Sequence, residues 1–99
     1  MSTVWTVVRY KTKEGFDDEF LSAFFSYKPN TPVPLLNKYF LSFRLIRVSE
    51  NEFVQIMECE SMDKLVDFQI EALTWLDTVE HLLEYYGDER TEAFSGFTI

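Results

Sequence analysis

The stretch that decides the fold runs from residue 39 to residue 60 and reads YFLSFRLIRVSENEFVQIMECE. Two segments rich in aromatic and branched residues flank the polar turn Ser49–Glu52. Apolar alternation with a period of two on both sides of a short polar turn predicts an antiparallel β-hairpin. If the turn has four residues, Val48 pairs with Phe53 and the remaining pairs follow by counting.

This register sorts the side chains of the hairpin onto two faces. The first face is close to a pure core and holds Tyr39, Leu41, Phe43, Leu45, Val54 and Ile56. The second face mixes large apolar groups with isolated polar groups, as the wall of a cavity does. Its members are Phe40, Ser42, Arg44, Ile46, Val48, Phe53, Gln55, Met57 and Cys59. Neither face has the composition of a solvent face.

The chain before the hairpin predicts a strand, a helix and a loop. Alternation over Val4–Thr12 is typical of a strand. Asp17 is the expected N-cap of a helix that continues to Tyr27, with apolar residues at helical spacing and acidic residues in its first turn. Three prolines follow, and because proline disfavours both helix interiors and central strands, we expect Lys28–Pro34 to be a stiff loop.

The chain after the hairpin predicts a long helix and a final strand. Ser61 is the expected N-cap, and apolar residues then recur at intervals of three and four to Tyr86. The apolar stripe is wider than a surface helix needs, which indicates contact with more than one layer or a bend near Thr74–Asp77. Gly87 is the expected C-cap, and residues 90–99 read as a strand.

The predicted order is therefore strand, helix, two hairpin strands, helix and strand. With right-handed crossovers, this order gives an α+β fold, the ferredoxin-like βαββαβ sandwich, as one domain over residues 1–99. Its four-stranded antiparallel sheet carries both helices on one face. The other face would expose Phe40, Ile46, Val48, Phe53 and Met57, too large an apolar patch for a monomer, so we expect a homodimer through that face.

Composition excludes several classes of partner. Seventeen acidic residues against nine basic residues give a formal charge of −8, so the general attraction to phosphate that nucleic-acid binding needs is missing. The chain has no signal-like N-terminus and no apolar run long enough to cross a bilayer, so we expect a soluble, cytoplasmic protein with no membrane partner. A single cysteine, Cys59, cannot form an internal disulfide.

Three segments carry a resemblance to a known family. They are TVVRYKTKEGFDDEFLSAF at residues 6–24, FVQIMECES at residues 53–61 and MDKLVDF at residues 62–68. Together they resemble the dimeric α+β barrel superfamily, and within it the antibiotic-biosynthesis-monooxygenase-like families. The resemblance implies a barrel cavity for a small molecule. Related activities include cofactor-independent oxidation of aromatic polyketides, haem degradation and isomerisation.

The chain departs from the family at two sets of positions. Members often carry Glu, Trp and Ser at alternate positions at the end of the third strand, where this chain has Met57, Cys59 and Ser61, so only the serine agrees. In the haem-degrading branch, the similar positions carry a set of Asn, Trp and His. Thr6 and Cys59 occupy the first two of these positions, and no histidine occupies the third.

The polar residues of the mixed sheet face are the candidate ligand contacts. Arg44 is the most informative, because a guanidinium among apolar groups needs an anion or water. It is expected to bind an anionic ligand or to pair with an acid of a partner subunit. His81, the only histidine, is interpreted either as a base or haem ligand or as an exposed helix residue without a role. The full candidate set is Arg44, Gln55, Ser42, Thr6, Tyr10 and Cys59.

Two classes of function follow. In the first, the cavity binds a small, partly aromatic and anionic molecule, with oxidation or isomerisation as the chemistry. In the second, the protein is a non-catalytic structural or ligand-sensing dimer, and the sequence leaves open which class applies. We expect no metal, flavin or haem, because the chain has no glycine-rich phosphate loop and no cysteine or histidine cluster. Asp63, Asp67 and Glu71 form an acidic line that is interpreted as a solvated helix face rather than a cation site.

Overall fold

A computed structural model describes residues 2–99 of the chain. In chain order, the elements are β1 (Val4–Lys11), α1 (Asp17–Phe24), α2 (Pro32–Tyr39), β2 (Phe40–Ser49), β3 (Glu52–Cys59), α3 (Met62–Val79), the 3-10 turn η1 (Glu80–Leu82) and β4 (Glu92–Phe97).

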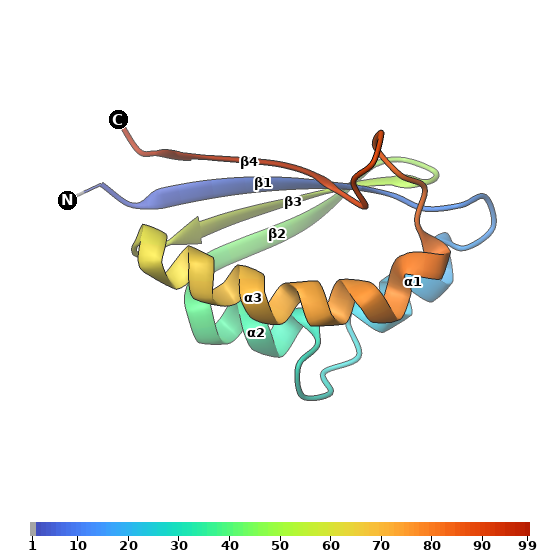
Figure 1. Ribbon diagram of the computed structural model, residues 1–99, viewed down its shortest axis with the longest axis horizontal. Coiled ribbons are helices and arrows are strands. Elements are labelled where there is room, and N and C mark those ends of the chain that lie inside the picture. Colours follow the sequence, from blue (N-terminus) through green and yellow to red (C-terminus); the bar gives the residue numbers. More distant parts are fainter. Residues whose placement is uncertain (1) are drawn as a thin grey trace.

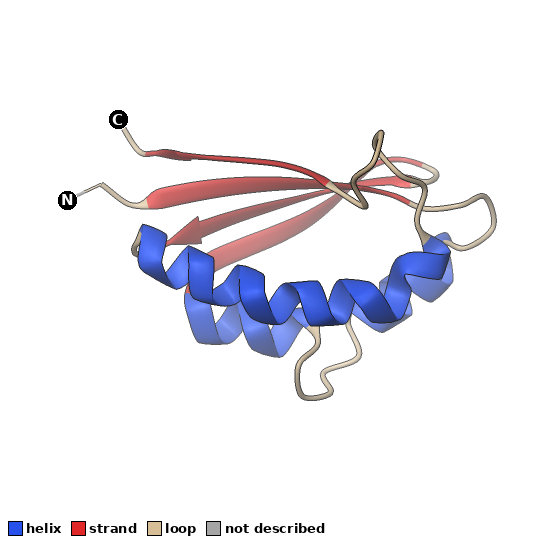
Figure 2. Cartoon of the chain, viewed as in Figure 1, coloured by secondary structure: helices blue, strands red, loops and turns tan. Residues whose placement is uncertain are grey.

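The four strands form one antiparallel sheet in the order β2-β3-β1-β4. The three α-helices within residues 2–99 all lie on one face of this sheet, and none of them lies over the other face (Figures 1 and 2). This is the predicted ferredoxin-like α+β arrangement, with the short helix α2 added between α1 and β2. The prediction of two layers with one bare sheet face is therefore confirmed.

The hairpin forms as predicted, but its register differs by one residue. Ser49 pairs with Glu52, and Arg47 rather than Val48 pairs with Phe53, with an irregularity between Arg47 and Ser49. Because side chains alternate across a strand, a shift of one residue in β2 moves its side chains to the opposite face relative to β3. The two predicted faces were therefore wrong in composition.

The observed faces combine half of each predicted face. Phe43 and Leu45 of β2 lie opposite Met57 and Gln55 of β3, on the side that the helices cover. Arg44 and Ile46 lie opposite Ile56 and Val54, on the helix-free side. Phe53 and Met57, which were predicted to be exposed there, are buried at 1% and 0% exposure.

The proline segment contains a helix that the sequence interpretation had excluded. Pro32 is the first residue of α2, and Pro34 lies in the same first turn. The amide groups of a first helical turn have no partner within the helix, so proline loses no hydrogen bond there and its fixed φ suits the helix. The predicted loop is real only up to Thr31, which precedes the helix with extended backbone angles.

The limits of the other helices also differ from their predictions. Helix α1 has its cap at Phe16, so Asp17 is its first residue rather than its N-cap, and it ends at Phe24 instead of Tyr27. Ser61 is confirmed as the N-cap of α3, because its side chain accepts a hydrogen bond from the Lys64 amide at 3.3 Å. Helix α3 runs through Thr74–Asp77 as one element.

The end of α3 is earlier than predicted. After η1, Leu83 pairs with Thr12 in an isolated bridge, so the chain has already left the helix. Gly87 is therefore not the C-cap, and its φ of +60° belongs to the turn between Tyr86 and Glu89. The apolar pattern extends past the end of α3 because Leu82 and Leu83 are also buried, although they are not part of the helix. The prediction of a longer helix followed from that pattern.

An aromatic cluster fills the space between the sheet and the helices. Phe20 of α1 lies at its centre, with ring centroids 5.2 Å from Tyr10, 5.4 Å from Phe53 and 6.1 Å from Trp75. These rings join α1, two central strands and α3, and all are buried. Contacts of this tilted kind stabilise a core beyond the burial of apolar area alone.

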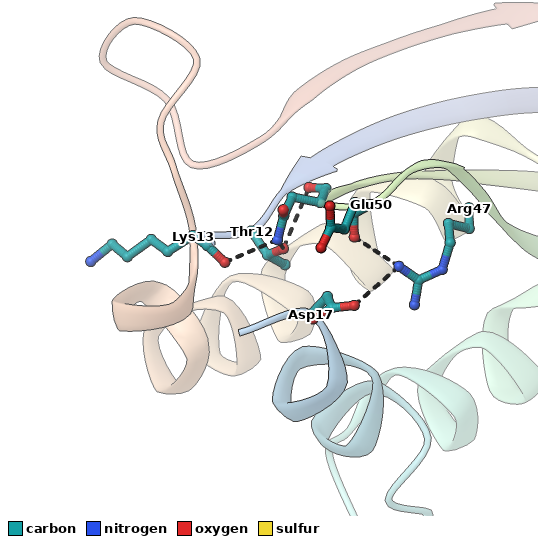
Figure 3. A network of polar contacts seen from close by, with 6 residues as sticks. Thr12, Lys13, Asp17, Arg47 and Glu50 are labelled. Atoms are coloured by element: carbon teal, nitrogen blue, oxygen red, sulfur yellow. Dashed lines mark hydrogen bonds and ion pairs between the residues drawn. The ribbon is translucent and has the colours of Figure 1, made fainter. Parts of the chain in front are cut away.

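The β2-β3 turn is tied to the region that follows β1 (Figure 3). The Asn51 side-chain amide donates to Thr12 Oγ1 at 3.0 Å and to the Lys13 carbonyl at 3.1 Å. Arg47 donates to Asp17 at 3.1 Å and to the Glu50 carbonyl at 2.7 Å. The hairpin tip is therefore held against the region between β1 and α1 by one side chain of β2, Arg47, and one of the turn, Asn51.

The helix-free face carries apolar residues from all four strands. Register pairs place Val7 between Ile56 and Phe94, with Ile46 opposite Val54 in the next row. Trp5, Ile46 and Phe94 are 39%, 44% and 62% exposed. Ion pairs of Arg9 with Glu52 and Glu92 lie beside these apolar residues on the same face. An exposed apolar patch bordered by charged groups is typical of an interaction surface. No helix within residues 2–99 is long and apolar enough to cross a membrane.

Candidate functional site

A cavity of about 250 Å³ lies between the helix-covered face of the sheet and helix α3. Its floor comes from β1 and β3, its roof from α3, and one end from α2. The side chains at its margin belong to α3 and to the region around the start of β4. The residues that line it are Thr6, Val8, Tyr10, Pro32, Leu35, Gln55, Met57, Leu65, Phe68, Gln69, Ala72, Leu73, Trp75, Leu76, Thr91 and Ala93.

The position of the helices explains why this space is open. Helix α1 covers one end of the sheet through Phe20, and α2 covers the other end through Leu35 and Leu36, which are buried. Strand β4 has no such cover, since all six of its residues are exposed. The cavity lies between the two packed ends, and its margin includes Gln69 and Leu73, both exposed.

The polar groups of the cavity are neutral. Among the described residues, its lining includes no aspartate, glutamate, lysine, arginine or histidine. Thr6 Oγ1 shares a hydrogen bond with Ser95 Oγ at 2.8 Å, across the β1-β4 pair. The Tyr10 hydroxyl donates to Gln55 Oε1 at 2.6 Å, and Gln55 Nε2 lies 2.8 Å from Met57 Sδ.

Tyr10 stays a neutral phenol. Its side chain is only 6% exposed, and the loss of solvent around it raises its pKa far above the ordinary value of 10.0. A phenol in this state can donate a hydrogen bond but cannot serve as a base near neutral pH. The cavity therefore offers hydrogen bonds and apolar contacts, without a charged partner or an activated base.

Three of the predicted site residues meet at this cavity. Thr6, Tyr10 and Gln55 all line it, from two neighbouring strands. Cys59 is buried at the end of β3, where its thiol lies 3.4 Å from the Tyr39 carbonyl and 3.3 Å from the Ser61 carbonyl, and it is not among the lining residues.

Arg44 and Ser42 lie elsewhere. Both are exposed residues of β2, and Arg44 lies opposite Ile56 on the helix-free face, where its guanidinium donates to the Phe43 carbonyl at 2.7 Å. The register error placed Arg44 beside Met57 and so put it in the cavity wall. The anionic character predicted for the ligand rested on that cation, and the described residues that line the cavity include no cationic side chain.

His81 and the acidic line of α3 are also separate from the cavity. His81 Nε2 lies 3.7 Å from Glu19 on the surface, with both side chains exposed. Glu71 contacts Lys38 at 3.6 Å and accepts a hydrogen bond from Tyr39, which ties α3 to α2. Over residues 2–99, no cluster of three or more His, Cys, Asp or Glu side chains has the spacing to hold a metal ion.

Sequence reasoning missed the contribution of the helices to this site. Helix α3 supplies seven lining residues: Leu65, Phe68, Gln69, Ala72, Leu73, Trp75 and Leu76. The sequence interpretation had treated the six apolar ones only as part of the helical stripe and had not singled out Gln69. The unusual width of the apolar stripe was the available signal. A stripe that is wider than one packed contact needs is consistent with a helix that faces both a core and a cavity.

Comparisons with known proteins place the fold in a defined class. No protein-family model matches the chain, and no curated protein matches it by sequence. Solved structures do match: they include ferredoxin-like proteins and candidate antibiotic biosynthesis monooxygenases, which share this sheet and helix arrangement. The resemblance that the sequence indicated is thus confirmed at the level of the fold.

Three of these structures can be named. A candidate antibiotic biosynthesis monooxygenase from Nitrosomonas europaea has a TM-score of 0.77 at 16% identity, over 98% of this chain and 90% of its own. One from Bordetella bronchiseptica has a TM-score of 0.74 at 14% identity, over 100% and 99%. A dimeric ferredoxin-like protein from an uncultured marine organism has a TM-score of 0.73 at 9% identity, over 100% and 90%.

Proposed function

We propose that this protein binds a small, neutral, partly aromatic molecule in the cavity between α3 and the sheet. The cavity itself carries the proposal: about 250 Å³ lined mainly by apolar side chains, with a few neutral polar groups. A dry apolar cavity of about 150 Å³ is enough to hold benzene, so this space suits one or two fused rings. The absence of charged groups from the described lining favours a neutral ligand over an anion.

The proposal includes a homodimer formed through the helix-free face. The apolar rows around Val7, Ile56 and Phe94 would be desolvated by a second copy of the same face about a two-fold axis. Arg44 lies on this face with a backbone carbonyl as its hydrogen-bond acceptor, which leaves donors for a carboxylate of the second copy. The marine ferredoxin-like neighbour, described as dimeric, supports this assembly. Sedimentation velocity at micromolar concentration should give a dimer, and a stable monomer would contradict it.

Binding is tested with the fluorescence of Trp75, which lines the cavity. The chain has two tryptophans, so a Trp5→Phe background leaves Trp75 as the only one, and excitation at the long-wavelength edge of absorption avoids the tyrosines. Neutral two-ring probes, tetralin and 1-tetralone, should produce a saturable change in emission. Ala72→Phe should abolish that change, because Ala72 lines the cavity and a phenyl group would fill it.

A matched control separates filling of the cavity from a general effect on α3. Thr74→Phe introduces the same side chain on the same helix, at an exposed position outside the lining, and should leave binding intact. If neither probe binds the Trp5→Phe protein, or if the Ala72→Phe variant binds the probes as well as the Thr74→Phe variant does, the cavity is not the binding site.

Oxidation of the bound molecule is a second candidate function. Two of the fold neighbours are described as candidate antibiotic biosynthesis monooxygenases, which favours it. The described residues of the lining provide no base at neutral pH, so the substrate itself would have to be reactive toward oxygen. Oxygen uptake in the presence of a naphthol measures this activity. Uptake that is equal with and without the protein would leave binding as the function.

A further inference from the structure

One buried side chain in the cavity has a hydrogen-bonding capacity that its neighbours do not meet. Gln55 is 1% exposed and lines the cavity from β3. Its Oε1 accepts the Tyr10 hydroxyl at 2.6 Å, while its Nε2 has Met57 Sδ as its partner at 2.8 Å. A side-chain amide carries two N–H donors, and a thioether is a weak acceptor. Buried polar groups normally have strong partners, so the amide nitrogen is underused.

The orientation of this amide follows from both of its neighbours. Tyr10 is a neutral phenol and donates its proton, so an oxygen is the suitable atom to face it. If the amide were turned over, Oε1 would lie against the Met57 sulfur, and two atoms bearing lone pairs would be in close contact. The nitrogen therefore faces the sulfur, and Tyr10 holds the amide in this position.

Other polar groups of the cavity are less suited to recognise a ligand. The Thr6 hydroxyl is already shared with Ser95, and Gln69 is exposed at the margin, where water can satisfy it. Thr91, the remaining hydroxyl of the lining, is partly exposed just before β4, where water can also reach it. A ligand hydroxyl would compete with Tyr10 for Gln55 Oε1. A hydrogen-bond acceptor on the ligand would instead bind the Gln55 amide nitrogen, whose present partner is the weakly accepting Met57 sulfur. A stronger acceptor in place of the sulfur, or in addition to it, favours binding.

We propose that Gln55, held in place by Tyr10, is the specificity-determining donor of the cavity, and that it selects neutral ligands carrying a carbonyl oxygen. This inference rests on the proposed binding function and specifies its substrate class. A carboxylate would pay a large desolvation cost in a cavity without a cation, and a plain hydrocarbon would leave the amide hydrogens without an acceptor.

Three matched probes test the inference on the Trp5→Phe protein through Trp75 emission. Tetralin is the hydrocarbon, 1-tetralone adds a carbonyl to the same skeleton, and tetralin-1-carboxylate adds a negative charge. The ketone should bind roughly three- to tenfold more tightly than the hydrocarbon, the range for one neutral hydrogen bond. The carboxylate should bind more weakly than either. Equal binding of ketone and hydrocarbon would overturn the inference and leave the proposed function standing, whereas no binding by any probe would remove both.

Two substitutions assign the effect to one amide. Gln55→Met keeps the length of the side chain and removes its N–H groups, so the preference for the ketone should disappear while tetralin still binds. Gln69→Met makes the same change in the other glutamine of the chain, at the margin, and the preference should remain. Loss of the preference in Gln69→Met alone would overturn the assignment to Gln55.

A measurement on the Trp5→Phe protein covers the case in which Gln55→Met does not fold. With ¹⁵N-labelled glutamine, the protein should give two pairs of side-chain amide proton signals, one pair for each glutamine, and Gln69→Met assigns them. Addition of 1-tetralone should move the Gln55 signal downfield, because a carbonyl oxygen replaces sulfur as acceptor, and tetralin should not produce this shift. An unchanged Gln55 signal in the presence of bound ketone would refute the proposal.

Discussion

Replacement of Tyr10 by phenylalanine, measured at two pH values, tests the electrostatics of the cavity wall directly. At about pH 8, the substitution removes the donor to the buried Gln55 Oε1. A buried acceptor left without a partner costs about 1 to 3 kcal/mol. The variant should therefore be less stable than the parent protein by that amount, in urea unfolding followed by circular dichroism.

Raising the pH should narrow the difference in unfolding free energy between the parent protein and Tyr10→Phe. Burial raises the pKa of Tyr10 in the folded protein above its ordinary value of 10.0, which applies in the unfolded chain. The contribution of the neutral, buried phenol to the free energy of unfolding is complete below pH 10. It falls as the pH rises toward the pKa of the folded state, because over this range only the unfolded state loses the proton. At about pH 11, Tyr10 should therefore lower the unfolding free energy of the parent protein by about 1.4 kcal/mol relative to its value at pH 8, and Tyr10→Phe should lack this decrease.

The comparison isolates Tyr10 from the other tyrosines. The pKa values of Tyr39, Tyr85 and Tyr86 are also raised, but their contributions occur in both proteins and cancel in the difference. Both proteins are measured at the same concentration, since association would also affect stability. Tyr27→Phe, at a tyrosine that is 69% exposed, is the control and should change the unfolding free energy by less than about 0.5 kcal/mol. A Tyr10→Phe difference that is the same at both pH values would refute the assignment of Tyr10 as a buried neutral donor.

Two further predictions concern the surfaces around the site. Ile46→Asp places a charge on the helix-free face and should convert the proposed dimer to a monomer in sedimentation. Val66→Asp, at an exposed position of α3, should leave the oligomeric state unchanged, and the reverse result would place the interface on the helices. Asn51→Ala removes two hydrogen bonds that tie the hairpin tip to Thr12 and Lys13, and should lower the unfolding free energy by about 1 to 3 kcal/mol. The exposed Asn37→Ala in α2 is its control, and an equal effect of both substitutions would show that the tie does not contribute.

Local patterns in the sequence were sufficient for the type and order of most elements. Alternation on both sides of Ser49–Glu52 predicted the hairpin, and Ser61 with its following stripe predicted α3. Together with the handedness of crossovers, these elements lead to the four-stranded sheet with helices on one face. These features depend on the spacing of neighbouring residues, which the sequence contains explicitly.

The tertiary structure decided the register of the hairpin and the set of residues that line the candidate cavity. An irregularity between Arg47 and Ser49 shifts β2 by one residue, which takes Arg44 out of the predicted cavity wall and onto the helix-free face. The two registers have similar apolar patterns on both faces, so alternation could not distinguish them. Tyr10 and Gln55 both line the cavity, and their mutual hydrogen bond joins positions 45 residues apart. Such a contact depends on the pairing of β1 with β3, and the role of each side chain in the cavity is set by that pairing and by the helix packed above it.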